Sequence, residues 1–202
     1  MTARAQLLFD FVSPNAYLIW WPMRDIIRRT GAELDVLPVF LGGMHKLTGN
    51  APPMIRDREV KGKNEYAMLE LERFVRKHEL SDFKMNPNFP FNSILLQRML
   101  FAADQDGRGV QFVETLLPKI WEQGLDVTDP EAVGAAVAAG GFDVEDLFRR
   151  AQTDEVKEGL FANTENAVER GAFGIPTVFI GDEMFFGKER LEQIEAELDR
   201  VG

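Results

Sequence analysis

Strand-like patterns occur only near the two ends of this chain, and this distribution restricts the possible folds more than any other feature. Near the N-terminus, residues 6–11 and 34–41 are rich in Leu, Val and Phe, as strands are. Residues 14–30, between them, have the apolar periodicity of a helix. A strand, a helix and a second strand in this order predict a right-handed crossover with the two strands parallel.

The C-terminal pattern predicts a β-hairpin and one more helix. Residues 175–180 are β-branched and apolar, a Gly181-Asp182 turn follows, and residues 183–186 complete the hairpin. Residues 188–201 then show an amphipathic helical pattern. The two ends therefore predict one mixed α/β sheet flanked by helices.

The middle of the chain predicts helices and no strand. Helical periodicity covers residues 59–78, 93–106, 109–123, 130–139, 144–151 and 154–171. We therefore expect a discontinuous domain formed by residues 1–55 and 172–202. An all-helical insertion over residues 56–171 would interrupt it.

The absence of cysteine excludes several kinds of chemistry. Disulfides, thiolate metal sites, iron–sulfur clusters and a cysteine nucleophile all need a residue that this chain does not contain. The two histidines, His45 and His78, are too few for a histidine-rich metal site, so we predict no metal and assign them no role. Any reactive thiol must come from outside the chain.

Charge and hydropathy exclude further classes of partner. The net charge is -10, and no basic patch stands out, so nucleic acid is not an expected partner. No apolar run approaches the roughly 20 residues of a membrane helix. The N-terminal stretch is too short and too polar for a signal peptide, which predicts a cytoplasmic protein.

The order of elements resembles the thioredoxin superfamily with a helical insertion, as in DsbA-like proteins. The segment Gly174-Ile175-Pro176-Thr177 resembles the cis-proline loop of that superfamily. Its redox Cys-x-x-Cys motif follows the first strand, where this chain has Ser13-Pro14-Asn15-Ala16. Dithiol oxidoreductase chemistry is therefore excluded by composition.

Within that superfamily, the chain is similar to the 2-hydroxychromene-2-carboxylate isomerases and the kappa-class glutathione transferases. The matching pieces, in order along nearly the whole chain, are Phe9-Asp10-Phe11 with Ser13-Pro14 and Tyr17-Leu18, Gly49-Asn50-x-Pro52-Pro53, Lys63-x-x-Tyr66, Phe89-Pro90-x-Asn92, Ile120-Trp121, Gly171 to Thr177, and Phe185-Phe186-Gly187 with Glu189-Arg190-Leu191. Two departures concern the site. Asn15 and Ala16 replace a Tyr and a Ser, and Lys188-Glu189 replaces a polar-Asp pair.

The resemblance implies that glutathione is the cofactor and that Ser13 is the catalytic residue. A hydroxyl that donates to a thiolate stabilises it by roughly 1.5–3 kcal/mol, and a helix N-terminus favours an anion. The alternative is that Ser13 only caps the helix that begins at Pro14. Both roles are compatible, because a hydroxyl can accept one hydrogen bond and donate another.

The resemblance also implies which residues bind glutathione. The backbone of Ile175, before Pro176, would pair with the cysteinyl part as a short added strand. Glu189 would bind the γ-glutamyl ammonium, and Lys188 would reach the neighbouring carboxylate. The alternatives are a structural turn at Pro176 and a favourable acidic residue at a helix start for Glu189.

Asn50 and Lys63 complete the candidate set. The resemblance places both near the rest of the glutathione site, and Lys63 would bind the glycyl carboxylate as a point charge. Asn50 also suits a turn without a ligand, and Lys63 also suits a solvated helix face. Lys61, two residues before Lys63, is an alternative for the same contact.

Three functions follow from these residues. The first is a glutathione-dependent cis–trans isomerase acting on an intermediate of aromatic-compound degradation. The second is a kappa-like glutathione transferase that conjugates electrophiles. The third is a non-catalytic thioredoxin-like module that binds peptides. The resemblance further implies a homodimer, while the second substrate cannot be read from the sequence.

Overall fold

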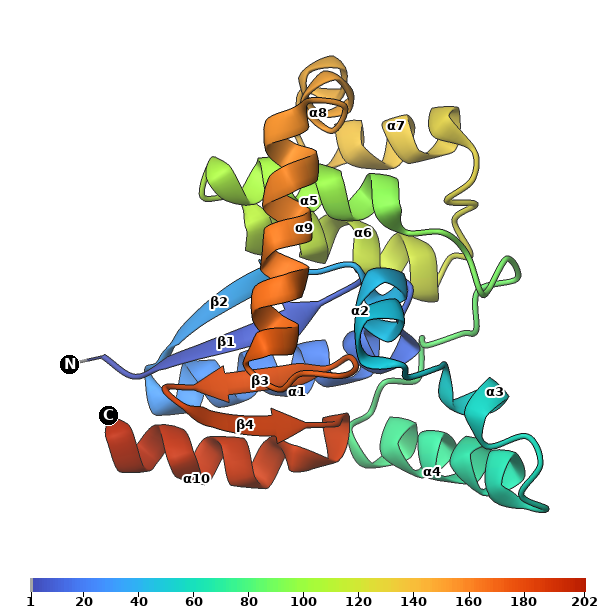
Figure 1. The fold of residues 1–202 in the computed structure, drawn as a ribbon, viewed down its shortest axis with the longest axis vertical. Coiled ribbons are helices and arrows are strands. Elements are labelled where there is room, and N and C mark those ends of the chain that lie inside the picture. Colours follow the sequence, from blue (N-terminus) through green and yellow to red (C-terminus); the bar gives the residue numbers. More distant parts are fainter. Residues whose placement is uncertain (1) are drawn as a thin grey trace.

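A four-stranded mixed sheet built from the two ends of the chain lies at the centre of the structure, which is a computed structural model that describes residues 2–202 (Figure 1). The elements in chain order are β1 (Arg4–Phe9), α1 (Pro14–Thr30), β2 (Glu33–Pro38), α2 (Leu41–Thr48), α3 (Pro53–Arg56), α4 (Lys63–Lys77), α5 (Ile94–Gln105), α6 (Gly109–Trp121), α7 (Pro130–Ala139), α8 (Val144–Arg150), α9 (Asp154–Glu169), β3 (Thr177–Ile180), β4 (Glu183–Phe186), the 3₁₀ turn η1 (Lys188–Arg190) and α10 (Leu191–Val201). The predicted fold class is confirmed.

The strand order in the sheet is β2-β1-β3-β4. β1 and β2 are parallel, with Leu7 opposite Val36, as the predicted crossover requires. β3 is antiparallel to β1, with Leu8 opposite Thr177, and β4 completes the hairpin with Phe186 opposite Thr177. The register brings the end of β1 and the start of β3 to the same edge of the sheet.

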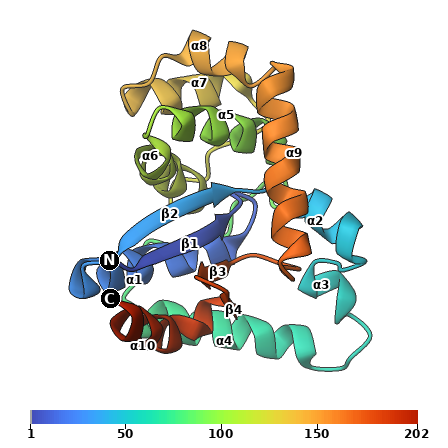
Figure 2. The ribbon, with the colours of Figure 1, turned by 60° about the vertical axis from the view of Figure 1, so that its left-hand side comes forward.

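Helices cover both faces of the sheet (Figure 2). α1 and α10 pack on one face, and α4 lies alongside them. α5 and α9 pack on the other face, with α6, α7 and α8 beyond. A single hydrophobic core runs through these layers, and its aromatic centre includes Phe9, which contacts Phe11 and Trp20 edge-on with ring centroids 4.9 and 5.6 Å apart.

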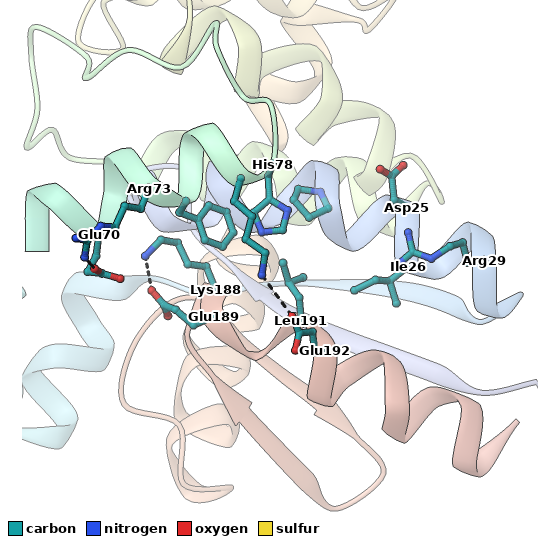
Figure 3. A pocket seen from close by; sticks show the side chains of 13 residues that line it. Asp25, Ile26, Arg29, Glu70, Arg73, His78, Lys188, Glu189, Leu191 and Glu192 are labelled. Atoms are coloured by element: carbon teal, nitrogen blue, oxygen red, sulfur yellow. Dashed lines mark hydrogen bonds and ion pairs between the residues drawn. The ribbon is translucent and has the colours of Figure 1, made fainter.

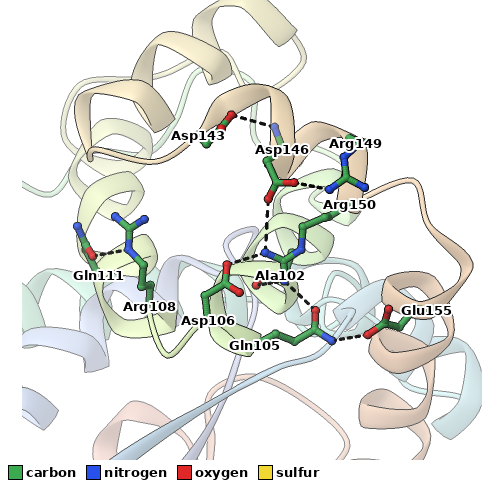
Figure 4. Close-up of polar contacts among 10 residues, drawn as sticks. All are labelled: Ala102, Gln105, Asp106, Arg108, Gln111, Asp143, Asp146, Arg149, Arg150 and Glu155. Atoms are coloured by element: carbon green, nitrogen blue, oxygen red, sulfur yellow. Dashed lines mark hydrogen bonds and ion pairs between the residues drawn. The ribbon is translucent and has the colours of Figure 1, made fainter.

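The helical layer is tied together by Arg150 at the end of α8 (Figure 4). Its guanidinium pairs with Asp106 and Asp146 and donates to the Ala102 carbonyl at 2.8 Å. It also donates to Gln105, at 3.0 Å. One mostly buried guanidinium therefore connects the end of α5 with α8.

Helix α1 carries its own start and stop signals. Ser13 is the N-cap, Pro14 occupies the first turn, and the helix continues without a break through Pro22. Gly31 ends it with a φ of 69°, and its N–H donates to the Ile27 carbonyl at 3.0 Å. These signals fix the start of α1 next to the end of β1.

The structure differs from the sequence prediction after the second strand. The predicted strand over 34–41 ends at Pro38, which has no N–H for a sheet ladder. Helix α2 begins at Leu41 and was not predicted. The helix predicted over 59–78 is shorter, since α4 begins at Lys63. The division into a domain and an insertion over 56–171 stays a prediction.

Candidate functional site

Ser13 lies at the junction of β1 and α1, where the chain turns from strand to helix. Its side chain is buried, its N–H donates to the Asp10 carbonyl at 3.1 Å, and its Oγ accepts from the Ala16 N–H at 3.3 Å. The structure thus confirms the helix cap. The hydroxyl hydrogen has no acceptor among residues 2–202, so it is available to a bound ligand.

The loop before β3 lies beside Ser13 because Thr177 pairs with Leu8, near the end of β1. The Ile175-Pro176 peptide bond is cis. Thr177 Oγ1 donates to the Gly174 carbonyl at 2.8 Å and holds the loop in place. Neither the N–H nor the carbonyl of Ile175 is bonded within the described part of the chain. This residue therefore offers one free backbone donor and one free backbone acceptor at the end of the sheet where β1 ends and β3 begins.

Lys188 and Glu189 follow β4 and adjoin the same loop. The Gly187 N–H donates to the Pro176 carbonyl at 3.0 Å, and Gly187 has a φ of 102°, which favours glycine. Lys188 is buried, and its Nζ lies 5.2 Å from the centre of the Phe74 ring. The Lys188 ammonium also pairs with the Glu189 carboxylate. Glu189 is therefore already balanced by a cation from its own chain.

These two residues form one end of a cleft of about 380 Å³ between α1, α4 and α10 (Figure 3). Glu70, Arg73 and Phe74 of α4 face them across the cleft. The charged side chains lining it are largely paired with one another: Lys77 with Glu192, and Arg73 with Glu70. The cleft adjoins the candidate site at Lys188 and Glu189, but Ser13, Ile175 and Pro176 do not line it.

Asn50 makes a polar contact with another part of the candidate site, and Lys63 makes none. Asn50 Nδ2 donates to the Phe173 carbonyl at 2.8 Å, so it fastens the loop after α2 to the cis-proline loop. Lys63 Nζ pairs with Asp57 at 2.9 Å, and none of its polar contacts connects it with the other candidates. Contacts along the chain thus bring together Ser13, Ile175, Pro176, Lys188, Glu189 and Asn50.

Gln97 is a site-building residue that the sequence analysis missed. It lies fully buried on α5, and its Nε2 donates to the Phe9 and Val39 carbonyls at 2.7 and 2.8 Å. Its Oε1 accepts from the Phe11 N–H at 3.3 Å. It therefore holds the ends of β1 and β2 in the segment that leads to Ser13. The available signal was an uncharged polar residue in a segment where Ile94, Leu95, Leu96, Met99 and Leu100 are apolar.

Trp121 fixes the same segment from α6. Its Nε1 donates to the Phe11 carbonyl at 3.1 Å, and its ring is fully buried. Trp121 is therefore part of the core. Together, Gln97 and Trp121 satisfy both backbone groups of Phe11 at the entrance to the Ser13 turn.

Asp10 is a fully buried carboxyl in this turn. Burial raises its pKa from 3.8 to about 6, even though the nearby Ser93 hydroxyl and hydrogen bonds from the Leu41 and Val12 N–H groups favour the charged form. By contrast, burial lowers the pKa values of His45 and His78, which keeps both imidazoles neutral at neutral pH. Asp10 is therefore the group near Ser13 that changes charge close to neutrality.

The raised pKa of Asp10 predicts a pH-dependent loss of stability. Its contribution is fully present below about pH 4, where both states are protonated, and is lost as pH rises through about 6. The shift corresponds to about 3 kcal/mol in the free energy of unfolding. Urea unfolding of wild type and Asp10→Asn at pH 4 and pH 7 checks this. Equal pH dependence in both proteins would contradict it.

The structure offers no sign of a metal site or a membrane span. Across residues 2–202, no three histidine, aspartate or glutamate side chains lie close enough together to hold a metal ion. None of the helices described has both the length and the apolar character that crossing a membrane demands.

The sequence profile of the DSBA-like thioredoxin domain family matches residues 6–199. The chain belongs to this family. The chain is also similar to solved members of the fold. It superposes on a 2-hydroxychromene-2-carboxylate isomerase with a TM-score of 0.82 at 24% identity, covering 98% of this chain and 95% of that one. A probable DsbA oxidoreductase from Streptomyces coelicolor gives a TM-score of 0.74 at 15% identity, with 98% and 89% covered.

Two relatives of this DSBA-like thioredoxin domain match over nearly its whole length. The 2-hydroxychromene-2-carboxylate isomerase of Sphingobium xenophagum is 29% identical over 201 residues, covering 98% of this chain and 99% of its own. The glutathione S-transferase kappa 1 of Homo sapiens is 27% identical over 197 residues, covering 93% and 87%. Both names denote enzymes. One belongs to the isomerases and the other to the kappa-class transferases, the two groups that the sequence motifs resemble.

Proposed function

We propose that the chain is a glutathione-dependent isomerase of the 2-hydroxychromene-2-carboxylate isomerase type. The observation that carries the proposal is the Ser13 hydroxyl, whose hydrogen is free at the start of α1, beside the unpaired backbone of Ile175. The hydroxyl would donate a hydrogen bond to the thiolate of glutathione. The free N–H and carbonyl of Ile175 would pair with the backbone of its cysteinyl unit. The 2-hydroxychromene-2-carboxylate isomerase of Sphingobium xenophagum, 29% identical over 201 residues, supports the same assignment.

The residues of the site fit glutathione in part. The Ile175 N–H and carbonyl would pair with the cysteinyl unit, and Asn50 would hold the loop that carries them. Glu189 and Lys188 would bind the γ-glutamyl end, with the ammonium on Glu189 and the carboxylate on Lys188. Because these two side chains are paired with each other, binding must open or share that ion pair. Lys63 would bind the glycyl carboxylate after leaving Asp57.

Ser13 determines the charge state of the thiol. A free thiol has a pKa of about 8.5, so only a few per cent is ionised at pH 7. A hydrogen bond from Ser13 and the positive end of α1 would lower that pKa by about one to two units. Roughly a quarter to three quarters of the bound thiol would then be thiolate at pH 7, against a few per cent of the free thiol.

When bound, glutathione would supply a thiolate for addition to the conjugated double bond of the ring-opened substrate and for elimination after rotation about the resulting single bond, which gives the trans product and restores the thiolate. This chain's part is to hold the sulfur at Ser13 and to keep it unprotonated. The cleft beside Glu189 and the turn around Asn15 and Ala16 border the space for the second substrate, an aromatic carboxylate. We also expect the protein to act in the cytoplasm as a homodimer.

A kappa-like transferase is the alternative that a specific observation favours, because the chain is 27% identical to the glutathione S-transferase kappa 1 of Homo sapiens. The same Ser13 thiolate would then attack an electrophile with a better leaving group, and glutathione would be consumed. A non-catalytic binding module at the cis-proline loop would instead show neither glutathione binding nor dependence on Ser13.

One pair of measurements tests the proposal. The ultraviolet absorbance of the thiolate, followed against pH in the protein–glutathione mixture, should give a thiol pKa below the free value. The isomerisation rate of 2-hydroxychromene-2-carboxylate should fall to background when glutathione is omitted. Consumption of glutathione with 1-chloro-2,4-dinitrobenzene and no isomerisation would instead favour the transferase. No glutathione binding would overturn both enzyme functions.

A further inference from the structure

Asp10 is a buried carboxyl that the proposed reaction does not use. It follows β1 directly and comes three residues before Ser13. Its Oδ1 accepts from the Val12 N–H at 3.1 Å, and its Oδ2 accepts from the Leu41 N–H at 2.8 Å. One side chain therefore connects the turn that leads to Ser13 with the first residue of α2.

The surroundings of this carboxyl contain dipoles and no cation. Just before α5, the Ser93 hydroxyl lies near it and has no hydrogen-bond partner among the described residues. From α9, the Thr164 hydroxyl accepts from the neighbouring Phe40 N–H at 3.0 Å. Gln97 and Trp121, from α5 and α6, contact the flanking backbone. Within residues 2–202 no charged side chain acts on Asp10, so its charge has no counter-ion.

The Asp10 carboxylate, which has no counter-ion in the described part of the chain, belongs to the same backbone turn as Ser13, where the thiolate would be held. The Asp10 carbonyl accepts from the Ser13 N–H at 3.1 Å, which fixes the two residues relative to each other. Two like charges separated by protein rather than water each favour the protonated form of the other. Because Asp10 is buried and has no counter-ion among the described residues, its negative charge would favour the protonated form of a thiol held at Ser13.

We propose that Asp10 and the thiolate held at Ser13 form one coupled pair, in which each negative charge makes the other harder to form. The proposal rests on the proposed function, since the thiolate is that of bound glutathione. Asp10 is in this view a positioning residue. It holds the turn in place. Its negative charge disfavours the thiolate, which Ser13 and the N-terminus of α1 stabilise.

The coupling predicts a sign that a purely structural role would not produce. If Asp10 only held the turn, replacing it would loosen Ser13, and the pKa of the bound thiol would rise. If its charge opposes the thiolate, Asp10→Asn removes the repulsion, and that pKa falls by about one unit. Ser13→Ala shifts the same quantity in the opposite direction, because it removes a donor.

The first test uses the unchanged protein. The carbon chemical shift of the Asp10 carboxyl, followed against pH by NMR, should show a pKa near 6 without ligand. Saturation with glutathione should raise this pKa, by up to about one unit where the thiol is already ionised, while S-methylglutathione, which has no ionisable thiol, should leave it unchanged. Equal values with both ligands overturn the coupling. No binding of either ligand overturns the proposed function and the coupling with it.

The second test measures the bound thiol in variants. Asp10→Asn should lower its pKa, and the matched variant Asp104→Asn should not. Asp104, an exposed residue of α5, also has a carboxyl whose pKa is raised by partial desolvation and by Asp35. Asp35 pairs with Gln6 in the sheet, away from Ser13. An unchanged or raised thiol pKa in a folded Asp10→Asn protein overturns the proposal. If that variant does not fold, the NMR titration decides.

Discussion

Ser13→Ala should lower the glutathione-dependent rate at pH 7 by roughly ten- to a hundredfold, because the thiolate loses its hydroxyl donor. The pKa of the bound thiol should return toward the free value of about 8.5. The loss should then shrink as pH rises past that value, since the thiol ionises without help. Rates measured from pH 6 to pH 10 check both the size and the pH dependence.

A second helix cap provides the control for Ser13. Thr153 caps α9 by accepting from the Val156 N–H at 3.4 Å, as Ser13 caps α1, but it lies outside the candidate site. Thr153→Ala should cost about 1 kcal/mol of stability and leave the rate unchanged. A Ser13→Ala protein that lost only stability, with a normal rate and thiol pKa, would reduce Ser13 to a cap.

Gln97→Leu should lower the free energy of unfolding by about 3–5 kcal/mol, because it leaves buried backbone groups without partners. Leucine has nearly the volume of glutamine, so the change removes hydrogen bonds and creates little cavity. The Val39 carbonyl and the Phe11 N–H lose their side-chain partner, and the Phe9 carbonyl keeps only the Val39 N–H. Urea unfolding followed by circular dichroism measures the difference.

The matched control for Gln97 lies on the same helix. Gln105, also on α5, is exposed; its Nε2 donates to Glu155 at 2.9 Å and its Oε1 accepts from Arg150 at 3.0 Å, both near the surface where water can replace the side chain. Gln105→Leu should change the free energy of unfolding by less than about 0.5 kcal/mol. Equal losses for the two variants would show that the cost comes from replacing glutamine in α5, and that the contacts of Gln97 with the strands contribute nothing special.

The elements with strong local signals were predictable from the sequence. Ser13-Pro14 and Gly31 delimit α1 through capping chemistry that depends on neighbouring residues alone, and the structure reproduces the predicted bounds. The same holds for the hairpin turn at Gly181. Helix α2 was not predicted, because the N–H of its first residue is bound by the Asp10 carboxylate, a partner 31 residues away in the sequence. Such a contact exists only after folding and leaves no local pattern.

The candidate site divides along the same line. The motifs at Ser13 and Pro176 follow the end of β1 and precede the start of β3, and the pairing of Leu8 with Thr177 brings those two strand ends together. The motifs gave no indication that Lys188 neutralises Glu189 or that Asp57 holds Lys63, since both pairings depend on side-chain geometry. Gln97 acts on residues 58 and 88 positions away, so no sequence window contains both it and its partners.

The fastening of the Ser13 turn by Gln97 and Trp121 has a consequence for modularity. Both residues come from the segment between the two halves of the sheet, so that segment supplies part of the scaffold on which the turn is built. A shortened chain that joins residue 55 to residue 172 would retain every strand and Ser13 itself. It would nevertheless leave the backbone of Phe11 open to water, so a minimal version with a formed site cannot be obtained by excision. Any exchange of this segment between related proteins must carry the Gln97 and Trp121 contacts with it.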